Sequence, residues 1–328
     1  MKHFDQFDVE DIQRIAIIRR NNLGDLMSSL PLVNYCKKNF PKAKITLISD
    51  TSNSMLFPYL ENIDEVIVIE KGNKYLKSLK AALKARKAKF DLAIAARPNA
   101  MKLNHLLLYF AKAKHRIAVT EPDKWHNKFV NCQTPRDLIT GNHQALQILQ
   151  ILNSSLQEVE CELYPKLKML TASRPRCDNL CRLLVTVSQS RARNRISVDK
   201  HVSLLNRLYD QVAFKTIILS MEKDAALAHE LAKKLKCTSE VAVTPEFGRF
   251  METVANADCV FSGDGGLCHI AAGYNKPQCV LFGRDVDKQW APLSSKAVSL
   301  MHPDDVNAIS DDDIFPLLLS TLKKGQNA

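Results

Sequence analysis

The sequence lacks any hydrophobic run long enough to cross a bilayer. Its longest apolar stretches, such as 106–111 and 66–69, are far shorter than the roughly 20 residues of a membrane-spanning helix. Residues 1–18 also lack the basic start and unbroken apolar stretch of a secretion signal, because acidic residues precede the first apolar run. We therefore expect a cytoplasmic protein whose contact with a membrane is peripheral.

The sequence also lacks the cysteine patterns of disulfide-rich and zinc-binding proteins. Its nine cysteines are an odd number, scattered from Cys36 to Cys279 without a repeated CxxC pair. This pattern is typical of reduced thiols. A DxD motif or other acidic cluster is likewise missing beside the glycine-rich segment described below. We expect no metal ion and no other cofactor.

Acidic residues are outnumbered by basic ones, 35 to 46, which gives a formal net charge of +11. Such an excess favours an anionic partner, which could be nucleic acid, an anionic membrane surface or a phosphorylated substrate. The basic residues are dispersed over many predicted helices, without an aromatic-rich sheet motif or zinc-finger spacing. This dispersal argues against nucleic acid.

The length of 328 residues is sufficient for two domains. In each half, short apolar segments alternate with amphipathic helical ones, which predicts a parallel sheet covered by helices. The strands expected are 14–18, 44–48, 65–69, 92–95, 116–119, 183–187, 216–219, 259–262 and 278–282. The helices expected are 25–39, 73–87, 103–113, 142–152, 199–210, 224–235, 249–256, 266–273 and 311–324.

A segment rich in charge, Ser, Thr and Pro, 153–182, separates the two halves. We therefore predict an α/β protein with two Rossmann-like doubly wound domains that face each other across a cleft. Their bounds would be 1–165 and 166–310. A final helical segment, 311–328, could pack back across the cleft.

The first candidate site follows the first predicted strand. A loop with Asn22 and Gly24 leads from strand 14–18 to a helix that begins at Asp25. This is the carboxyl end of a parallel strand, where ligands bind in α/β proteins. Asp25 could simply cap its helix and complement the helix dipole, or it could be a catalytic carboxylate. The residue types alone favour the cap.

The second candidate site is the segment Phe261-Ser-Gly-Asp-Gly-Gly-Leu-Cys-His. It predicts a strand that ends near Asp264, a turn with Gly265 and Gly266, and a helix with His269 in its first turn. Free amides at the start of such a helix suit a diphosphate, and the histidine ring could bind a phosphate or a sugar. The alternative is an ordinary glycine-rich turn between a strand and a helix.

The third candidate site is the loop after strand 183–187. It contains Ser190 and three arginines within five residues, Arg191, Arg193 and Arg195, which could neutralise a nucleotide diphosphate. The alternative is a solvated basic loop. Glu222 and Asp224 follow strand 216–219.

These segments together resemble glycosyltransferase family 9, the ADP-heptose:lipopolysaccharide heptosyltransferases. The matching positions in the two most specific motifs are Gly24, Asp25, Leu30, Pro31, Asp264, Gly266 and His269. The resemblance spans nearly the whole chain. It implies a GT-B fold and an inverting, metal-independent transfer of a sugar, heptose, from ADP-heptose to the inner core of lipopolysaccharide.

The resemblance also implies roles for individual residues. Asp25 would be the base that accepts a proton from the acceptor hydroxyl, in an N-terminal domain where Asn22 and Gly24 help to bind the acceptor. The C-terminal domain would bind the nucleotide-sugar donor through Ser190, Arg193, Arg195, Glu222, Asp264, Gly265, Gly266 and His269. Either Glu222 or Asp224 would be the acid that contacts the nucleotide ribose. The acceptor would be an anionic, lipid-linked saccharide at the inner face of the inner membrane.

Two departures from the family pattern leave a different function open. Gly265 stands where the family has Thr or Ser. In the segment 194–197, Asn194 stands where the family has Lys, and Ile196-Ser197 replaces its Trp-Pro. A carbohydrate-binding protein without catalysis is therefore one alternative. A dinucleotide-dependent oxidoreductase is another, although neither half has a GxGxxG segment after its first strand.

Overall fold

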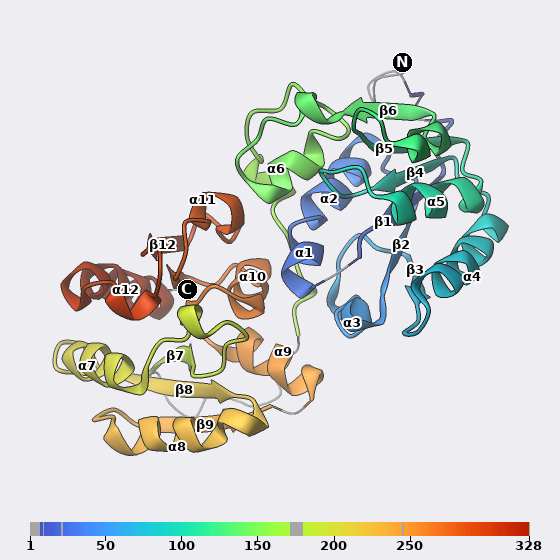
Figure 1. Cartoon of the computed structure of the whole chain (residues 1–328). Helices are drawn as coiled ribbons and strands as arrows, with labels where there is room; N and C mark the ends of the chain where they lie inside the picture. The colour runs from blue at the N-terminus through green and yellow to red at the C-terminus, as the bar shows by residue number, and fades with distance from the viewer. Residues whose placement is uncertain (1–6, 9, 21, 171–179, 245, 328) are drawn as a thin grey trace. The chain divides into compact units, whose positions relative to one another are not determined.

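The computed structural model describes residues 7–8, 10–20, 22–170, 180–244 and 246–327. The chain divides into two compact units, Met1–Pro165 and Lys166–Ala328. Each unit contains one six-stranded sheet with helices around it (Figure 1). All neighbouring strands in both sheets are parallel.

The first unit has the strand order β3-β2-β1-β4-β5-β6. Its strands are β1 (Arg14–Ile18), β2 (Lys44–Asp50), β3 (Glu65–Ile69), β4 (Leu92–Ala95), β5 (His115–Thr120) and β6 (Cys132–Pro135). Its helices are α1 (Leu23–Met27), α2 (Leu30–Asn39), α3 (Thr51–Ser54), α4 (Lys74–Lys87), α5 (Lys102–Ala111) and α6 (Gln144–Leu149), with the short 3-10 helix η3 (Trp125–Phe129) after β5.

Helices cover the central strands of this sheet on both faces. Alternate residues of β1, such as Ala16 and Ile18, pack in one hydrophobic core with α4 and α5, while α2 and α6 contact each other on the opposite side (Figure 1). The four residues 15–18 are consequently all buried. A parallel strand covered on both faces reads as a continuous apolar run, which is why this strand was predictable from its sequence.

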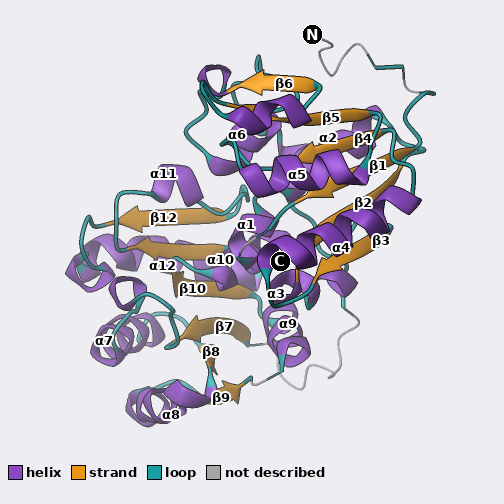
Figure 2. Ribbon diagram, turned by 45° about the vertical axis from the view of Figure 1, so that its right-hand side comes forward, coloured by secondary structure: helices purple, strands orange, loops and turns teal. Residues whose placement is uncertain are grey.

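The second unit has the strand order β12-β11-β10-β7-β8-β9. Its strands are β7 (Cys181–Thr186), β8 (Phe214–Ser220), β9 (Ser239–Val243), β10 (Cys259–Gly263), β11 (Gln278–Phe282) and β12 (Ala297–Met301). Its helices are α7 (Val198–Tyr209), α8 (Ala225–Lys234), α9 (Phe247–Asn256), α10 (Gly266–Gly273), α11 (Asp287–Trp290) and α12 (Asp311–Gln326), which are distributed around the sheet in Figure 2.

Both units have the same strand order when each is counted from its own first strand. The order reverses between β1 and β4 in the first unit and between β7 and β10 in the second. Ligands of doubly wound sheets bind at the carboxyl ends of the strands at such a reversal. The topology thus brings the loop after β1 beside the end of β4, and the loop after β7 beside the end of β10.

The three strands that the sequence did not predict, β6, β9 and β12, are all edge strands. Most of their residues are only half-buried. An edge strand has a neighbour on one side alone and needs no continuous apolar run, so its hydrophobic signal is weak.

One predicted helix was wrong in its extent. The helix expected over 25–39 is two helices, α1 and α2, separated by Ser28 and Ser29, whose hydroxyls donate to the carbonyls of Asp25 and Leu26 at 2.9 and 2.7 Å. Such side-chain bonds compete with the helical ladder. The final helix, α12, packs against α7, β7, β10 and β11, so it belongs to the core of the second unit.

Candidate active site

The loop after β1 is organised by a buried arginine, Arg19, that is 2% exposed. Its Nη2 lies 2.5 Å from Oδ1 of Asp25, and its Nε donates to the Asp25 carbonyl at 2.9 Å. Its Nη1 donates to the carbonyl of Ala96, just beyond β4, at 2.6 Å. Arg19 therefore fixes the start of α1 against the end of the neighbouring strand.

Burial lowers the pKa of Arg19 to about 10. The Asp25 carboxylate raises this pKa in part, and the positive charge of Arg97 lowers it further. The guanidinium is still charged at neutral pH. A buried charge needs a partner, and the carboxylate of Asp25 supplies it.

Asp25 does not cap its helix. Helix α1 begins at Leu23 with Asn22 at its N-cap, which places Asp25 inside the first turn. Its side chain is 21% exposed, so solvent or a substrate can reach the carboxylate while Arg19 holds it. If Asp25 is not catalytic, its structural role is therefore an ion pair with Arg19 and not a helix cap.

Sequence reasoning missed Arg19. The signal that could have found it is a charged residue directly after the buried apolar run 15–18, at the end of the sheet where ligands bind.

In the second unit, Asn194 ties the loop after β7 to the ends of two other strands. Its Nδ2 donates to the carbonyl of Asp264 at 3.1 Å and to the carboxylate of Asp264 at 3.0 Å. Its Oδ1 accepts from the amide of Gly283 at 3.1 Å, and the side chain is 1% exposed. Nearby, Gln189 Nε2 donates to the carbonyl of Gly263 at 3.0 Å. Asn194, which differs from the lysine of the family pattern, is thus a buried residue that holds this loop against the strand ends.

Glycine is required at two of these contacts. A Cβ on Gly263 would lie 1.9 Å from the carbonyl oxygen of Asn194, and one on Gly283 would lie 2.1 Å from that of Arg193. A Cβ on Gly265 would instead meet Oε1 of Gln189 at 2.6 Å, the end of a flexible side chain. The loop after β7 therefore packs directly on the backbone of the strands, and position 265 has more room than the other two.

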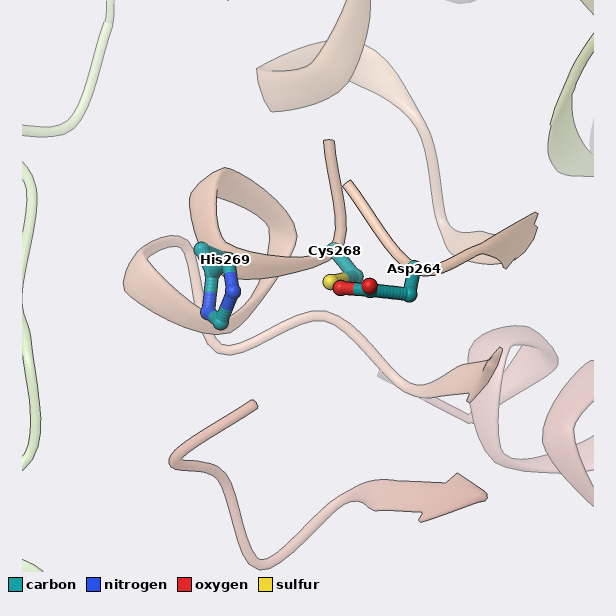
Figure 3. A group of neighbouring side chains, drawn as sticks. All are labelled: Asp264, Cys268 and His269. Carbon is teal, nitrogen blue, oxygen red and sulfur yellow. The ribbon is translucent and has the colours of Figure 1, made fainter. Parts of the chain in front are cut away.

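Asp264, Cys268 and His269 form a group around the start of α10 (Figure 3). Their possible ligand atoms lie within 4.8 Å of one another. Burial raises the pKa of Asp264, whereas Arg284, Arg191 and Asn194 act in the opposite direction. Burial, with a smaller effect of Asp264, raises the pKa of Cys268 to about 12, and its thiol donates to the carbonyl of Gly265 at 3.1 Å.

Carboxylate, thiol and imidazole are ligand types of transition-metal sites. The charges around this group, however, are those of an anion site. Arg191 Nη1 lies 3.8 Å from the Asp264 carboxylate, and Arg284 also acts on it. Gly265 is the N-cap of α10, so the first amides of the helix are not covered by a capping side chain. These amides and arginines suit phosphate oxygens better than a cation.

The other residues predicted to bind the donor differ in exposure and in their contacts. Ser190, Arg193 and Glu222 are exposed. Arg195 lies 3.7 Å from the buried carboxylate of Asp224 and donates to the carbonyl of Gln189 at 3.3 Å. Of the two acids after β8, the structure thus brings Asp224 to the arginine loop.

Residues 77–310 match the family model for glycosyltransferase family 9 (heptosyltransferase). The chain belongs to this family. A curated relative, lipooligosaccharide heptosyltransferase 2 of Haemophilus ducreyi, is 22% identical over 315 residues, which are 87% of each protein. A putative glycosyltransferase of Haemophilus influenzae is 21% identical over 305 residues, 86% of this chain and 87% of that protein.

Solved structures of the same family have a similar fold. A family 9 glycosyltransferase from Veillonella parvula has a TM-score of 0.79 at 16% identity, covering 97% of this chain and 98% of its own. The ADP-heptose lipopolysaccharide heptosyltransferase II of E. coli has a TM-score of 0.75 at 17% identity, covering 96% and 100%. E. coli heptosyltransferase WaaC with ADP has a TM-score of 0.72 at 14% identity, covering 94% and 100%.

The family membership and the two Rossmann-like units confirm the predicted GT-B fold class and the prediction of a glycosyltransferase. An oxidoreductase is therefore ruled out as the function of this family 9 transferase. No helix in the described part of the chain is both long and apolar enough to span a membrane. All eight cysteines in that part are free thiols.

Proposed function

We propose that this family 9 transferase moves a heptose from ADP-heptose to an inner-core lipopolysaccharide acceptor at the cytoplasmic face of the inner membrane. The observation that carries the proposal is the site at the start of α10, where helix amides without a capping side chain, exposed arginines and a buried carboxylate meet at the strand reversal of the second unit. ADP is the first nucleotide to test because a structure of similar fold was solved with ADP.

The second unit would bind the donor. The amides after Gly265 and Gly266, with His269 in the same turn, would hold the diphosphate. Arg193 and Arg191 would neutralise the charge that the diphosphate gains as it leaves. Arg195 with Asp224, or the exposed Glu222, would reach toward the ribose, and Ser190 would add a hydroxyl from the same loop.

The first unit would bind the acceptor through Asn22 and Gly24 and activate it through Asp25. The acceptor oxygen forms a bond to the anomeric carbon, the bond from that carbon to the diphosphate breaks, and Asp25 takes the hydroxyl proton. ADP leaves with the bonding electron pair. A positioned carboxylate is sufficient because the alcohol becomes acidic only as its new bond forms. Arg19 would keep the carboxylate in place, and no metal ion takes part in the proposed step.

Thermal unfolding with nucleotides tests the donor assignment. We expect ADP and ADP-heptose to raise the melting temperature in the presence of a chelator, because a ligand at about 100 times its Kd stabilises the native state by about 2.7 kcal/mol. UDP and GDP serve as matched controls and should have little effect. Stabilisation by UDP alone would contradict the ADP assignment, and loss of the ADP effect with chelator would contradict metal independence.

A transfer assay separates an enzyme from a carbohydrate-binding protein. ADP release from ADP-heptose in the presence of heptose-deficient lipopolysaccharide should exceed the release without acceptor. Tight ADP-heptose binding without acceptor-dependent release would instead support the binding protein that the changes at Gly265 and Asn194 leave open.

A further inference from the structure

One exposed surface of the first unit is both apolar and basic, and the donor and acceptor chemistry does not use it. It lies on α4, α5 and η3, and we name it the α4–α5 face. Its exposed apolar residues are Tyr75, Leu76, Leu79, Leu83, Phe110 and Trp125. Leu76 is 61% exposed, Trp125 55% and Leu83 46%. Single exposed leucines are ordinary on protein surfaces, but a continuous row of large apolar side chains marks an interaction site.

Helix α4 has three distinct stripes along its length. Ser78, Ala81, Ala82 and Ala85 are buried against the unit. The exposed leucines lie three and four residues apart, so they share one side of the helix. A lysine directly follows each of them in the sequence, at positions 77, 80 and 84, and these lysines form a parallel stripe beside the leucines.

The leucine stripe continues into an apolar hollow between α4 and α5. The residues that line the hollow include Tyr75, Ser78, Leu79, Leu103, Leu106 and Phe110. The two helices pack against each other, and Figure 2 shows them side by side on the same face of the sheet. The apolar area therefore spans both helices rather than one.

Lysine ammonium groups lie over the aromatic rings at the edge of this face. Lys102 Nζ is 5.1 Å from the centre of the Trp125 ring and 5.9 Å from that of Tyr75. Lys128 Nζ is 5.5 Å from the Trp125 ring. Aromatic rings that lie between an apolar surface and basic side chains are typical of protein surfaces that insert at the level of lipid headgroups.

The positive charge of α4 indicates which kind of partner binds the α4–α5 face. The helix carries Lys74, Lys77, Lys80, Lys84, Arg86 and Lys87 and no acidic residue. Of these, Lys77 is paired with Glu70 at 2.6 Å. A second copy of the chain placed on the same face would bring like charges together, which opposes a symmetric dimer. An anionic surface complements both the charges and the apolar stripe.

We propose that the α4–α5 face docks this transferase on a bilayer rich in anionic lipids. The leucines and aromatic rings enter the interface, and the lysines contact the headgroup phosphates. The proposal deepens the proposed function, on which it rests, because a lipid-linked acceptor lies in such a surface. The partner is the lipid bilayer itself, recognised through its charge and its acyl chains.

Flotation with vesicles tests this docking. The full chain should bind vesicles of equal parts phosphatidylglycerol and phosphatidylcholine and bind pure phosphatidylcholine far more weakly. In Lys80→Glu/Lys84→Glu, binding should fall at least tenfold, since each basic residue at an anionic surface contributes roughly a fivefold factor. Leu76→Gln/Leu83→Gln should also reduce binding, without harm to the fold, because both side chains are exposed.

Matched controls distinguish this face from net charge and general apolarity. Lys323→Glu/Lys324→Glu makes the same charge change on α12 of the second unit, and Leu138→Gln/Met169→Gln removes exposed apolar side chains elsewhere. Both controls should bind vesicles within about twofold of the parent protein. Equal loss in controls and test variants, or no preference for phosphatidylglycerol, would overturn the docking proposal. So would a concentration-dependent dimer that only the leucine variant abolishes.

Stabilisation by ADP, measured on the same proteins, keeps this test separate from the proposed function. Vesicle binding without any ADP effect would leave the docking intact and contradict the donor assignment. An ADP effect without vesicle binding would do the reverse.

Discussion

Replacing Asp25 by asparagine perturbs both the ion pair and the proposed base. The Nη2 of Arg19 would keep a hydrogen-bond acceptor at 2.5 Å but lose the opposite charge. A hydrogen bond to a charged group contributes about 1 to 2 kcal/mol more than a neutral one. Because Arg19 is 2% exposed, solvent does not replace the lost charge. We expect the melting temperature of the first unit to fall by roughly 2 to 8 °C.

The expected effect on transfer is much larger. General-base catalysis contributes roughly 100- to 10,000-fold, and an amide cannot accept the acceptor's proton. Turnover is measured as acceptor-dependent ADP release, at a temperature where the variant is fully folded. Donor affinity should stay within a few-fold of the parent value, because the proposed donor residues all belong to the second unit.

Asp50→Asn is the matched control for this experiment. The Asp50 carboxylate is 23% exposed and pairs with an arginine at 3.1 Å, so it resembles Asp25 in exposure and in the type of its partner. Its partner Arg20 is 19% exposed and can be solvated, so Asp50→Asn should lose less stability than Asp25→Asn and keep transfer within a few-fold. If Asp25→Asn retains transfer to the same degree, Asp25 is an ion-pair partner of Arg19 and not the base.

Two further predictions concern the second unit. Gly265→Ser should leave the melting temperature nearly unchanged, because the side chain of Gln189 can move aside. Gly263→Ala should lower the melting temperature strongly and weaken ADP binding, because the new Cβ would clash with the backbone carbonyl of Asn194. Equal melting temperatures for the two variants would contradict the close packing of the loop after β7. Burial lowers the pKa of His201 from 6.5 to about 4, although a hydrogen bond to the Ser197 carbonyl acts in the opposite direction. Below pH 6.5 this histidine is therefore protonated in the unfolded chain, whereas in the folded chain it stays neutral down to about pH 4. Stability should therefore fall with acidification, by about 2 kcal/mol from this histidine between pH 7 and pH 5, and His201→Gln should flatten the dependence seen in urea unfolding at those pH values.

Several elements of the fold could be predicted from the sequence because their signal is local. Strands β1, β3, β4 and β11 and helix α10 begin and end where they were predicted. The interior strands among them are covered on both faces, and each therefore appears as an unbroken apolar run. The motifs around Asp25 and Asp264 are also continuous segments, so the family could be inferred before the structure was known.

The contacts across the strand reversals, in contrast, could not be predicted from the sequence and were found in the folded structure. Arg19 donates to the carbonyl of Ala96, just beyond β4 and 77 positions away, and Asn194 bonds to residues 70 and 89 positions away. No local pattern encodes such pairs, because they arise from the order of strands in the sheet. The same is true of the α4–α5 face. The sequence predicts an amphipathic helix there, but the packing of α5 beside α4 decides which leucines stay exposed.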